Sequence, residues 1–239
     1  SSNFVNSCLH LKRYGDFPAV IAKLHSLKSS TPHMEDELNQ HIYYLELLYS
    51  LNTGHLDRGL ALAPELGEWL EQHAGQLNKA RELALYYNLA VIFLAAERYA
   101  DSLPWLNAII NDGHSDSRKD IQSFTRLLLP VVLFELGNDD ILESRYRSAQ
   151  YYLAQRGNVS DFEQAVLGFL KKLPWITAQS ELLEHCSRLK TYLESLLAHP
   201  QESRTLGLQE LWYWLESKLT GKPLAVVMRE HLRSGEPVQ

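Results

Sequence analysis

Cysteine is scarce in this sequence. Of 239 residues only Cys8 and Cys186 are cysteines, and they stand near opposite ends of the chain. Two cysteines allow at most one disulfide, and at this separation they cannot form a Cys-x-x-Cys metal-binding pair. The sequence therefore predicts two buried free thiols in a reducing compartment, rather than a disulfide framework or a cysteine metal site.

An excess of positive charge is also missing. The formal net charge is −6, and no run of lysine or arginine exceeds two residues. A nucleic-acid groove needs a basic patch that neutralises phosphates, and tight binding to an anionic membrane needs one as well. We therefore expect no nucleic-acid partner and no binding to a charged membrane surface.

Long apolar runs are absent as well. Residues 89–96 form one of the longest, whereas a membrane-spanning helix needs about 20 apolar residues. No basic start followed by an apolar core suggests a signal peptide, so we predict a cytoplasmic protein without a membrane span. The chain begins with Ser1-Ser2-Asn3 instead of methionine. A removed leader, a cleaved tag and a missing upstream domain would each produce this start.

Strand signals are nearly absent, and helical spacing takes their place. No alternating apolar and polar run is flanked by the Asn-Gly or Asp-Gly turns of β-hairpins. Apolar residues instead recur every three or four positions, as Leu85, Leu89, Phe93 and Ala96 do. This pattern predicts helices over 2–14, 17–28, 35–52, 56–74, 78–96, 99–111, 116–136, 139–155, 160–172, 178–198, 203–219 and 223–233.

Turn signals recur at a regular interval along these predicted helices. Gly15, Gly54, Gly137 and Gly221 each follow a predicted helix, where glycine adopts the left-handed cap conformation at little cost. A repeat of about 40 residues with one internal turn indicates two helices per unit, and units of this kind stack into α-solenoids.

Two groups of residues do not fit simple helices. Pro64, Pro104 and Pro130 fall inside predicted helices, and each is expected to kink or break its helix.

Trp212 and Trp214 stand two positions apart on one predicted helix, and side chains at this spacing cannot lie on the same face of a helix. We expect one of these tryptophans in the core and the other at its periphery.

The third unit carries a recognisable pattern. Residues 86–94 place an aromatic, a leucine and a small residue on the first helix, and residues 98–103 place an aromatic at the turn. This arrangement resembles a tetratricopeptide repeat, and residues 15–17 resemble the same turn in the first unit. In the second unit Glu46 stands where an apolar core residue is expected. Residues 214–225 resemble the tail of tetratricopeptide-like proteins common in Bacteroidetes bacteria.

The resemblance implies a specific fold. It implies an all-α chain that forms a right-handed α-solenoid, or α-α superhelix, of about six antiparallel helical hairpins. The whole chain, 1–239, would be one tetratricopeptide-like domain. Its units would span roughly 1–33, 34–76, 77–114, 115–158, 159–200 and 201–239.

The resemblance also implies a binding groove. The first helix of each hairpin would line a concave groove that takes a peptide or a helix of a partner protein. In that family a groove asparagine commonly bonds the backbone of the partner, and Asn6 and Asn88 occupy the matching position. An amide suits this role because it offers both a donor and an acceptor. Arg13, about two helical turns beyond Asn6, is placed to meet a carboxylate.

The remaining concave positions are apolar or aromatic, namely Tyr44, Leu48, Tyr87, Val91, Leu127 and Val131. Two interpretations of this strip are open. Tight coiling would bury it within the stack, whereas a looser stack would leave a groove for an amphipathic partner helix or for a second copy of the chain. We predict a partner-binding groove formed by Asn6, Arg13, Tyr44, Tyr87, Asn88 and Val91.

Catalytic signatures are missing from the sequence. It has no Gly-x-Ser-x-Gly elbow, phosphate loop, dinucleotide fingerprint or His-Glu-x-x-His zinc helix, and its ten histidines are scattered. We therefore expect no enzyme, no metal and no cofactor. The predicted function is a non-catalytic scaffold that binds a protein or peptide partner, with a homodimer as one option. The alternative is a peptide-sensing regulatory domain of a longer signalling or transcription protein.

Overall fold

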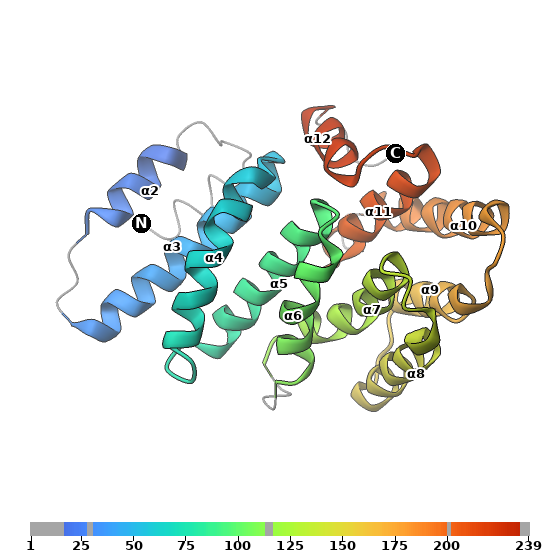
Figure 1. The fold of residues 1–239 in the computed structure, drawn as a ribbon, viewed down its shortest axis with the longest axis horizontal. Coiled ribbons are helices and arrows are strands. Elements are labelled where there is room, and N and C mark those ends of the chain that lie inside the picture. Colours follow the sequence, from blue (N-terminus) through green and yellow to red (C-terminus); the bar gives the residue numbers. More distant parts are fainter. Residues whose placement is uncertain (1–16, 28–30, 113–116, 200–201, 235–239) are drawn as a thin grey trace.

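The computed structural model describes residues 17–27, 31–112, 117–199 and 202–234. Within these ranges the chain forms eleven α-helices and no strand (Figure 1), which confirms the predicted all-α class. The helices are α2 (Phe17–His25), α3 (Pro32–Thr53), α4 (Leu56–Gln72), α5 (Lys79–Ala95), α6 (Tyr99–Ile110), α7 (Lys119–Glu135), α8 (Asp139–Arg156), α9 (Asp161–Leu170), α10 (Gln179–Leu197), α11 (Leu208–Thr220) and α12 (Leu224–Ser234). Two short 3₁₀ turns, η2 (Leu173–Trp175) and η3 (Glu202–Arg204), precede α10 and α11. The helix expected over 2–14 lies outside the described residues.

Local signals explain where individual helices begin and end. The side chain of Thr31 accepts a hydrogen bond from the backbone N–H of Met34 at 3.3 Å, and Pro32 occupies the first turn of α3. Ser160 and Glu163 form a reciprocal capping box at the start of α9. These contacts satisfy backbone donors that have no partner within the helix itself.

The three internal prolines leave their helices continuous. Pro64, Pro104 and Pro130 lie inside α4, α6 and α7, so none of them breaks its helix, and the kink expected as the other outcome stays a prediction. Each proline removes one backbone N–H donor. Most of the stability of a helix in a protein comes from packing its apolar face, and that packing outweighs one missing hydrogen bond here.

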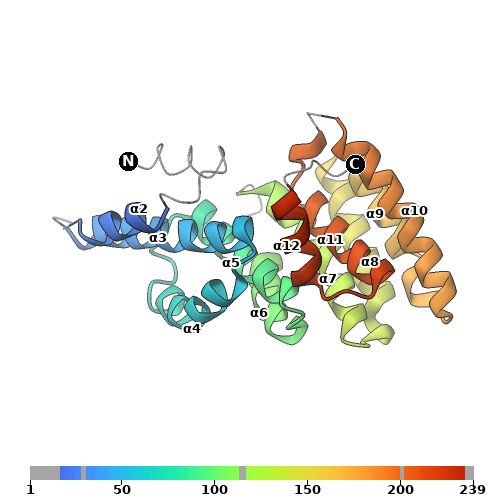
Figure 2. The same ribbon diagram turned by 90° about the horizontal axis from the view of Figure 1, so that it is seen from above.

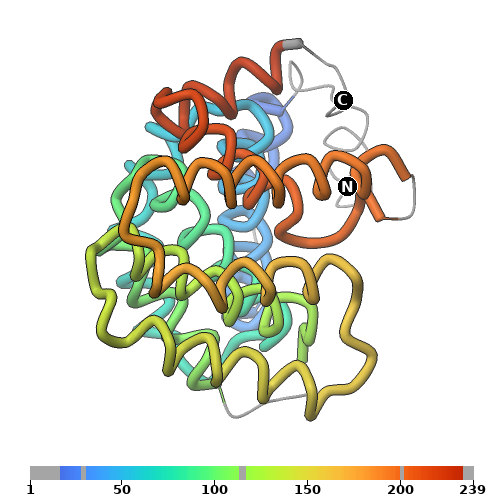
Figure 3. Tube along the Cα trace, turned by 90° about the vertical axis from the view of Figure 1, so that its right-hand side faces the viewer, coloured from blue at the N-terminus to red at the C-terminus, as the bar shows by residue number. Residues whose placement is uncertain are grey.

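Most helices pack against their neighbours along the chain. Each helix from α2 to α11 contacts the next helix along the chain, and α3 with α5, α5 with α7 and α7 with α9 add contacts between alternate helices. Figure 1 shows α2, α3 and α4 at one end of the molecule and α8, α9 and α10 at the other. Seen from the α10 end, the traces of α8, α9 and α10 run side by side (Figure 3).

The centre of the molecule is built on α5 and α7. Thirteen of the 17 residues of α5 are buried, and the buried residues of α7 run without a gap from Leu127 to Leu133. A helix that is apolar on nearly all sides is typical of a core position. Both helices therefore carry packed neighbours on several faces.

The C-terminal helix departs from this sequential packing. α12 contacts α3 and α5, which lie more than a hundred residues earlier in the chain (Figure 2). The backbone N–H of Leu224, at the start of α12, donates to Oε1 of Glu97 at 3.2 Å. A side chain added at Gly54 would place its Cβ 2.5 Å from Cγ of Arg229. These contacts hold α12 over the ends of α3 and α5.

Two expectations about single residues need correction. Trp214 is fully buried with its indole N–H on Glu135 at 2.6 Å, and Trp212 is also buried, with its indole N–H on Glu194 at 3.2 Å. The prediction that one of them would be peripheral is wrong, because packed helices surround α11 on both faces. Each indole N–H donates a hydrogen bond to one of these two carboxylates, so both rings can be buried in the core.

Polar groups in the core also have specific partners. Glu46 is buried where an apolar residue was expected, and its carboxylate accepts two hydrogen bonds from Arg58 at 2.6 and 2.7 Å. This bidentate pair accounts for a charge at a core position. Cys186 is a buried free thiol, as predicted, and burial raises its pKa to about 12. Cys8 lies outside the described residues.

Candidate functional site

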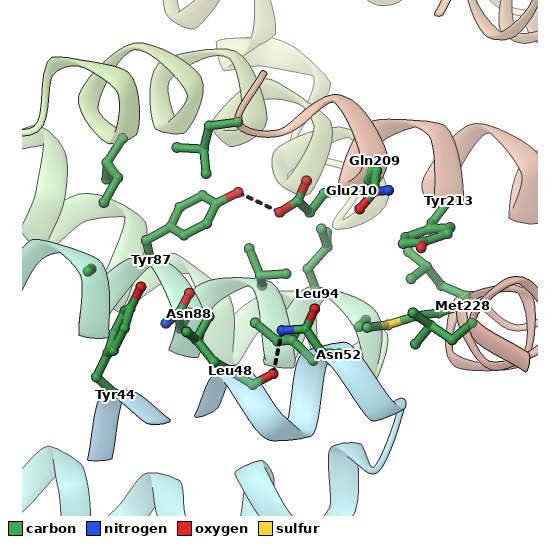
Figure 4. Close-up of a pocket in the computed structure, with 18 of the residues that line it drawn as sticks. Tyr44, Leu48, Asn52, Tyr87, Asn88, Leu94, Gln209, Glu210, Tyr213 and Met228 are labelled. Carbon is green, nitrogen blue, oxygen red and sulfur yellow. Dashed lines mark hydrogen bonds between the residues drawn. The ribbon is translucent and has the colours of Figure 1, made fainter. Parts of the chain in front are cut away.

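A cavity of about 260 Å³ lies where α3, α5, α11 and α12 converge (Figure 4). We call it the capped cavity, because the C-terminal helices cover a space that α3 and α5 would otherwise leave open. The segment before α7 completes its wall. The lining residues are Tyr44, Leu48, Leu51, Asn52, Ala84, Tyr87, Asn88, Val91, Leu94, Ala95, Arg118, Ile121, Leu206, Gln209, Glu210, Tyr213, Leu224, Met228 and Leu232.

Helical periodicity explains why α3 and α5 each present a stripe to this cavity. The lining residues of α3 are Tyr44, Leu48 and the pair 51–52, spaced by three or four positions. The α5 positions 84, 87–88, 91 and 94–95 follow the same rule. Residues at this spacing lie above one another on one helix face, so one stripe from each helix forms the floor.

Asn88 is the most unusual residue in this floor. Its side chain is 4% exposed, and its Nδ2 atom has no hydrogen-bond partner among the described residues. Figure 4 shows its amide between Tyr44 and Leu48. A buried donor without a partner costs about 1–3 kcal/mol. Native chains rarely keep such a group, and this sets Asn88 apart from the other residues of the floor.

Tyr87 and Glu210 face each other across the cavity (Figure 4). The phenol O–H of Tyr87 donates to Oε1 of Glu210 at 2.8 Å, joining residues 123 positions apart in the sequence. Burial raises the pKa of Glu210, and burial together with the nearby carboxylate raises the pKa of Tyr87 well above its usual value. This bond connects α5 to α11 at the wall of the cavity.

The start of α11 fixes the position of Glu210. Gly207 precedes the helix with φ 89°, in the left-handed region, and a Cβ there would lie 2.2 Å from the ring of Phe124. The expected start of this helix at 203 is therefore wrong, because the chain turns at Gly207 and α11 begins at Leu208. Glu210 stands in the first turn, where its carboxylate also accepts a hydrogen bond from the backbone N–H of Gly207.

A cation stands at another part of the wall. Arg118 precedes α7 and donates two hydrogen bonds to the carboxylate of Asp120, at 3.0 and 2.8 Å. These bonds with Arg118 hold the pKa of Asp120 below its usual value although burial acts in the opposite direction. The charge of Arg118 is thus offset locally. Burial raises the pKa of Tyr44, and nearby Arg118 opposes this effect.

The cavity brings together four of the six residues predicted for the partner groove. Tyr44, Tyr87, Asn88 and Val91 all line it, whereas Asn6 and Arg13 lie outside the described residues. Burial holds for Tyr87, Val91, Leu127 and Val131 of the apolar strip, whereas Tyr44 and Leu48 are half-buried. The groove for a partner helix or a second copy stays a prediction.

Sequence reasoning missed the residues that α11 and α12 contribute. The predicted groove was lined by the first helices of the hairpins alone, and no pattern linked Glu210, Tyr213 or Met228 to α5. The only local signals were Gly207 and Gly221, which mark the ends of α11. Neither glycine shows which distant helix α11 and α12 would meet.

Two other kinds of site are absent from the part of the chain that the structure describes. No group of three or more His, Cys, Asp or Glu side chains in residues 17–27, 31–112, 117–199 and 202–234 is arranged to hold a metal ion. Over the same residues, no helix combines the length and apolar character needed to cross a bilayer. No protein-family model matches this chain, and neither a curated protein nor a solved structure matches it.

Proposed function

We propose that this chain is a non-catalytic protein-interaction domain that binds a peptide or helix of a partner in the capped cavity. The helices would form a tetratricopeptide-like, right-handed α-solenoid, in which the first helices of successive hairpins supply the binding surface. The sequential packing of the helices and the lining of the cavity by α3 and α5 support this arrangement.

The observation that carries the proposal is the unpartnered amide of Asn88 in the floor of a mixed polar and apolar cavity. A partner's backbone carbonyl would accept a hydrogen bond from Nδ2, while its side chain would contact Val91, Leu94 and Met228. Ligand sites commonly combine a mostly apolar lining with a few placed polar groups. The capped cavity has this composition.

A random peptide library displayed on phage tests this function. Peptides would be selected on the wild-type chain and their affinities compared on Asn88→Leu, which removes the amide at similar volume. Asn107→Leu, an exposed position on α6, is the matched control. We expect selected peptides to bind Asn88→Leu at least tenfold more weakly and Asn107→Leu unchanged. Failure to select any peptide, or equal binding to Asn88→Leu, would contradict the proposal.

The cap formed by α12 favours peptide sensing as a second candidate function. Leu224, Met228 and Leu232 of α12 line the cavity, so an occupant would change the contacts that hold this helix. A ligand that binds one position of α12 better than another shifts the population of that position. A change in the position of α12 would alter hydrogen exchange along the whole helix on peptide binding, whereas a simple scaffold would show slower exchange only at the residues that contact the peptide.

A further inference from the structure

The two charged residues that line the capped cavity differ in whether they have a partner of opposite charge. Only two of its lining residues are charged, Arg118 and Glu210. Arg118 is paired with Asp120 through two hydrogen bonds. Glu210 accepts a hydrogen bond from Tyr87, but no cation among the described residues pairs with it. Glu210 is therefore the acidic group of the cavity wall that has no cationic partner among the described residues.

Capping of α11 does not by itself explain this carboxylate. Glu210 accepts a backbone hydrogen bond at the helix start, but a capping side chain can perform that role in contact with water, and glutamine caps in the same way. Burial raises the pKa of Glu210 and so disfavours its charged form. Helix capping therefore does not explain why this position holds a glutamate instead of a neutral glutamine.

Aromatic rings and apolar side chains line most of the cavity around the Tyr87–Glu210 hydrogen bond. Tyr44, Tyr87 and Tyr213 line the same cavity, with leucine, valine and methionine side chains between them. Aromatic faces attract cations, most strongly where water is excluded. A buried carboxylate forms its strongest hydrogen bonds with ammonium or guanidinium groups. The complement of this wall is a cationic group on an apolar stem.

The size of the cavity limits what it can hold. Its volume of about 260 Å³ lies below the range of about 300–1,000 Å³ that is usual for sites of drug-sized ligands. One long side chain of a partner fits this space better than a folded segment does. Lysine and arginine are the side chains that combine a long apolar stem with a cationic end.

We propose that the capped cavity binds an alkylammonium or guanidinium group, with Glu210 as its counter-ion. Under the proposed function, on which this inference rests, a lysine or arginine side chain of the partner peptide supplies that group. The cation would meet the carboxylate of Glu210 near the Tyr87 hydroxyl.

Single-residue probes test this inference without knowledge of the partner. NMR titration of the ¹⁵N-labelled chain would compare N-acetyl-lysine amide and N-acetyl-arginine amide with N-acetyl-norleucine amide, which keeps an apolar stem without the charge. We expect a saturable change for the lysine or arginine probe and at least tenfold weaker binding of norleucine. The Nε-acetylated lysine probe, which is neutral, should behave like norleucine.

A matched pair of variants tests the role of the carboxylate. Glu210→Gln should weaken binding of the charged probe at least tenfold, whereas Glu71→Gln, an exposed position on α4, should leave it unchanged. Equal binding of lysine and norleucine probes, no binding of either charged probe, or unchanged binding to Glu210→Gln would overturn the inference. The acetylated probe keeps the test decisive even where Glu210→Gln folds poorly.

The peptide selection separates this inference from the proposed function. Selected peptides that depend on Asn88 but carry no lysine or arginine would contradict the cation site and leave the peptide-binding function in place. Charged probes that bind through Glu210, in a chain from which no peptide is selected, would support the cation site and contradict the peptide-binding function.

Discussion

At the scale of single residues, two side chains of the capped cavity stand in surroundings that do not suit them. Asn88 buries a donor without a partner, and Glu210 holds a carboxyl group whose charged form is disfavoured by burial. A chain optimised for stability alone would replace both with apolar or neutral groups. Groups that reduce stability yet line a cavity are typical of binding sites.

Replacing Asn88 with leucine should therefore stabilise the folded chain. The substitution removes a buried amide that lacks a partner and keeps a similar volume, and we expect the free energy of unfolding to rise by about 1–3 kcal/mol. Chemical denaturation monitored by circular dichroism measures the change. A loss of stability of similar size would show that the amide already has a partner in the folded chain.

The carboxyl of Glu210 should make stability depend on pH in a defined direction. Because its pKa is raised in the folded state, the folded chain holds this proton more tightly than the unfolded chain does. The group therefore reduces stability as pH rises above its unfolded pKa of about 4.5, until the pH passes the folded pKa. We expect Glu210→Gln to be more stable than wild type at pH 7.

Denaturation series across pH measure this difference. The stability difference between Glu210→Gln and wild type should shrink towards zero as pH falls below about 4.5, where the glutamate is protonated in both states. A difference that is constant from pH 4 to pH 8 would mean that the raised pKa of Glu210 does not contribute.

At the scale of elements, the position of α12 depends on one close approach to α3. Gly54 ends α3 with φ 72° and ψ 11°, and Arg229 of α12 lies where a side chain at Gly54 would extend. Gly221 ends α11 with φ 70° and ψ 8°, but nothing lies within 4 Å of its added Cβ. The two glycines share a backbone conformation and differ in their neighbours.

This pair of glycines separates backbone strain from helix docking. Gly221→Ala should cost about 1–2 kcal/mol, the usual penalty of a left-handed conformation for alanine. Gly54→Ala should cost at least about 1 kcal/mol more, because α12 must move to accommodate the new methyl group. Thermal denaturation of both variants measures the difference. Equal losses would show that α12 is not held against Gly54.

The positions of the helices along the chain follow closely from the sequence. Apolar residues at three- and four-residue spacing and glycine at helix ends predicted every described helix from α2 onward, and the largest difference is the start of α11. Periodicity succeeds because most of the helices bury one face against a neighbour, and this spacing of apolar residues can be seen in the sequence. The prolines show its limit, since whether a helix continues through Pro64 or Pro104 depends on packing against other helices.

At the scale of the whole molecule, the arrangement around the capped cavity could not be predicted from periodicity. The floor formed by Tyr44, Tyr87 and Asn88 follows from the spacing of residues on α3 and α5. The opposite wall depends on Glu210 meeting Tyr87 and on Leu224 meeting Glu97. Contacts over more than a hundred positions leave no local pattern, so the helices were predicted and the cap over the cavity was not.

Hydrogen exchange should show where this packing is concentrated. α5 and α7 lie at the centre of the core, whereas only three residues of α8 are buried. Exchange that requires wide unfolding is slowest in such central helices. We expect amides in α5 and α7 to exchange most slowly and those in α8 at least tenfold faster. Equal protection of α8 and α5 would contradict the described distribution of the core.

The side-chain amide of Asn88 offers the most direct test of the proposed function, because that function makes its N–H group the hydrogen-bond donor to a bound peptide. Its ¹H–¹⁵N resonances would be assigned by their loss in Asn88→Leu and followed while a selected peptide is added. The account predicts that they shift saturably to lower field, as expected when Nδ2 gains an acceptor. Unchanged Asn88 side-chain resonances at saturating peptide would contradict the account, since binding would then occur elsewhere on the chain.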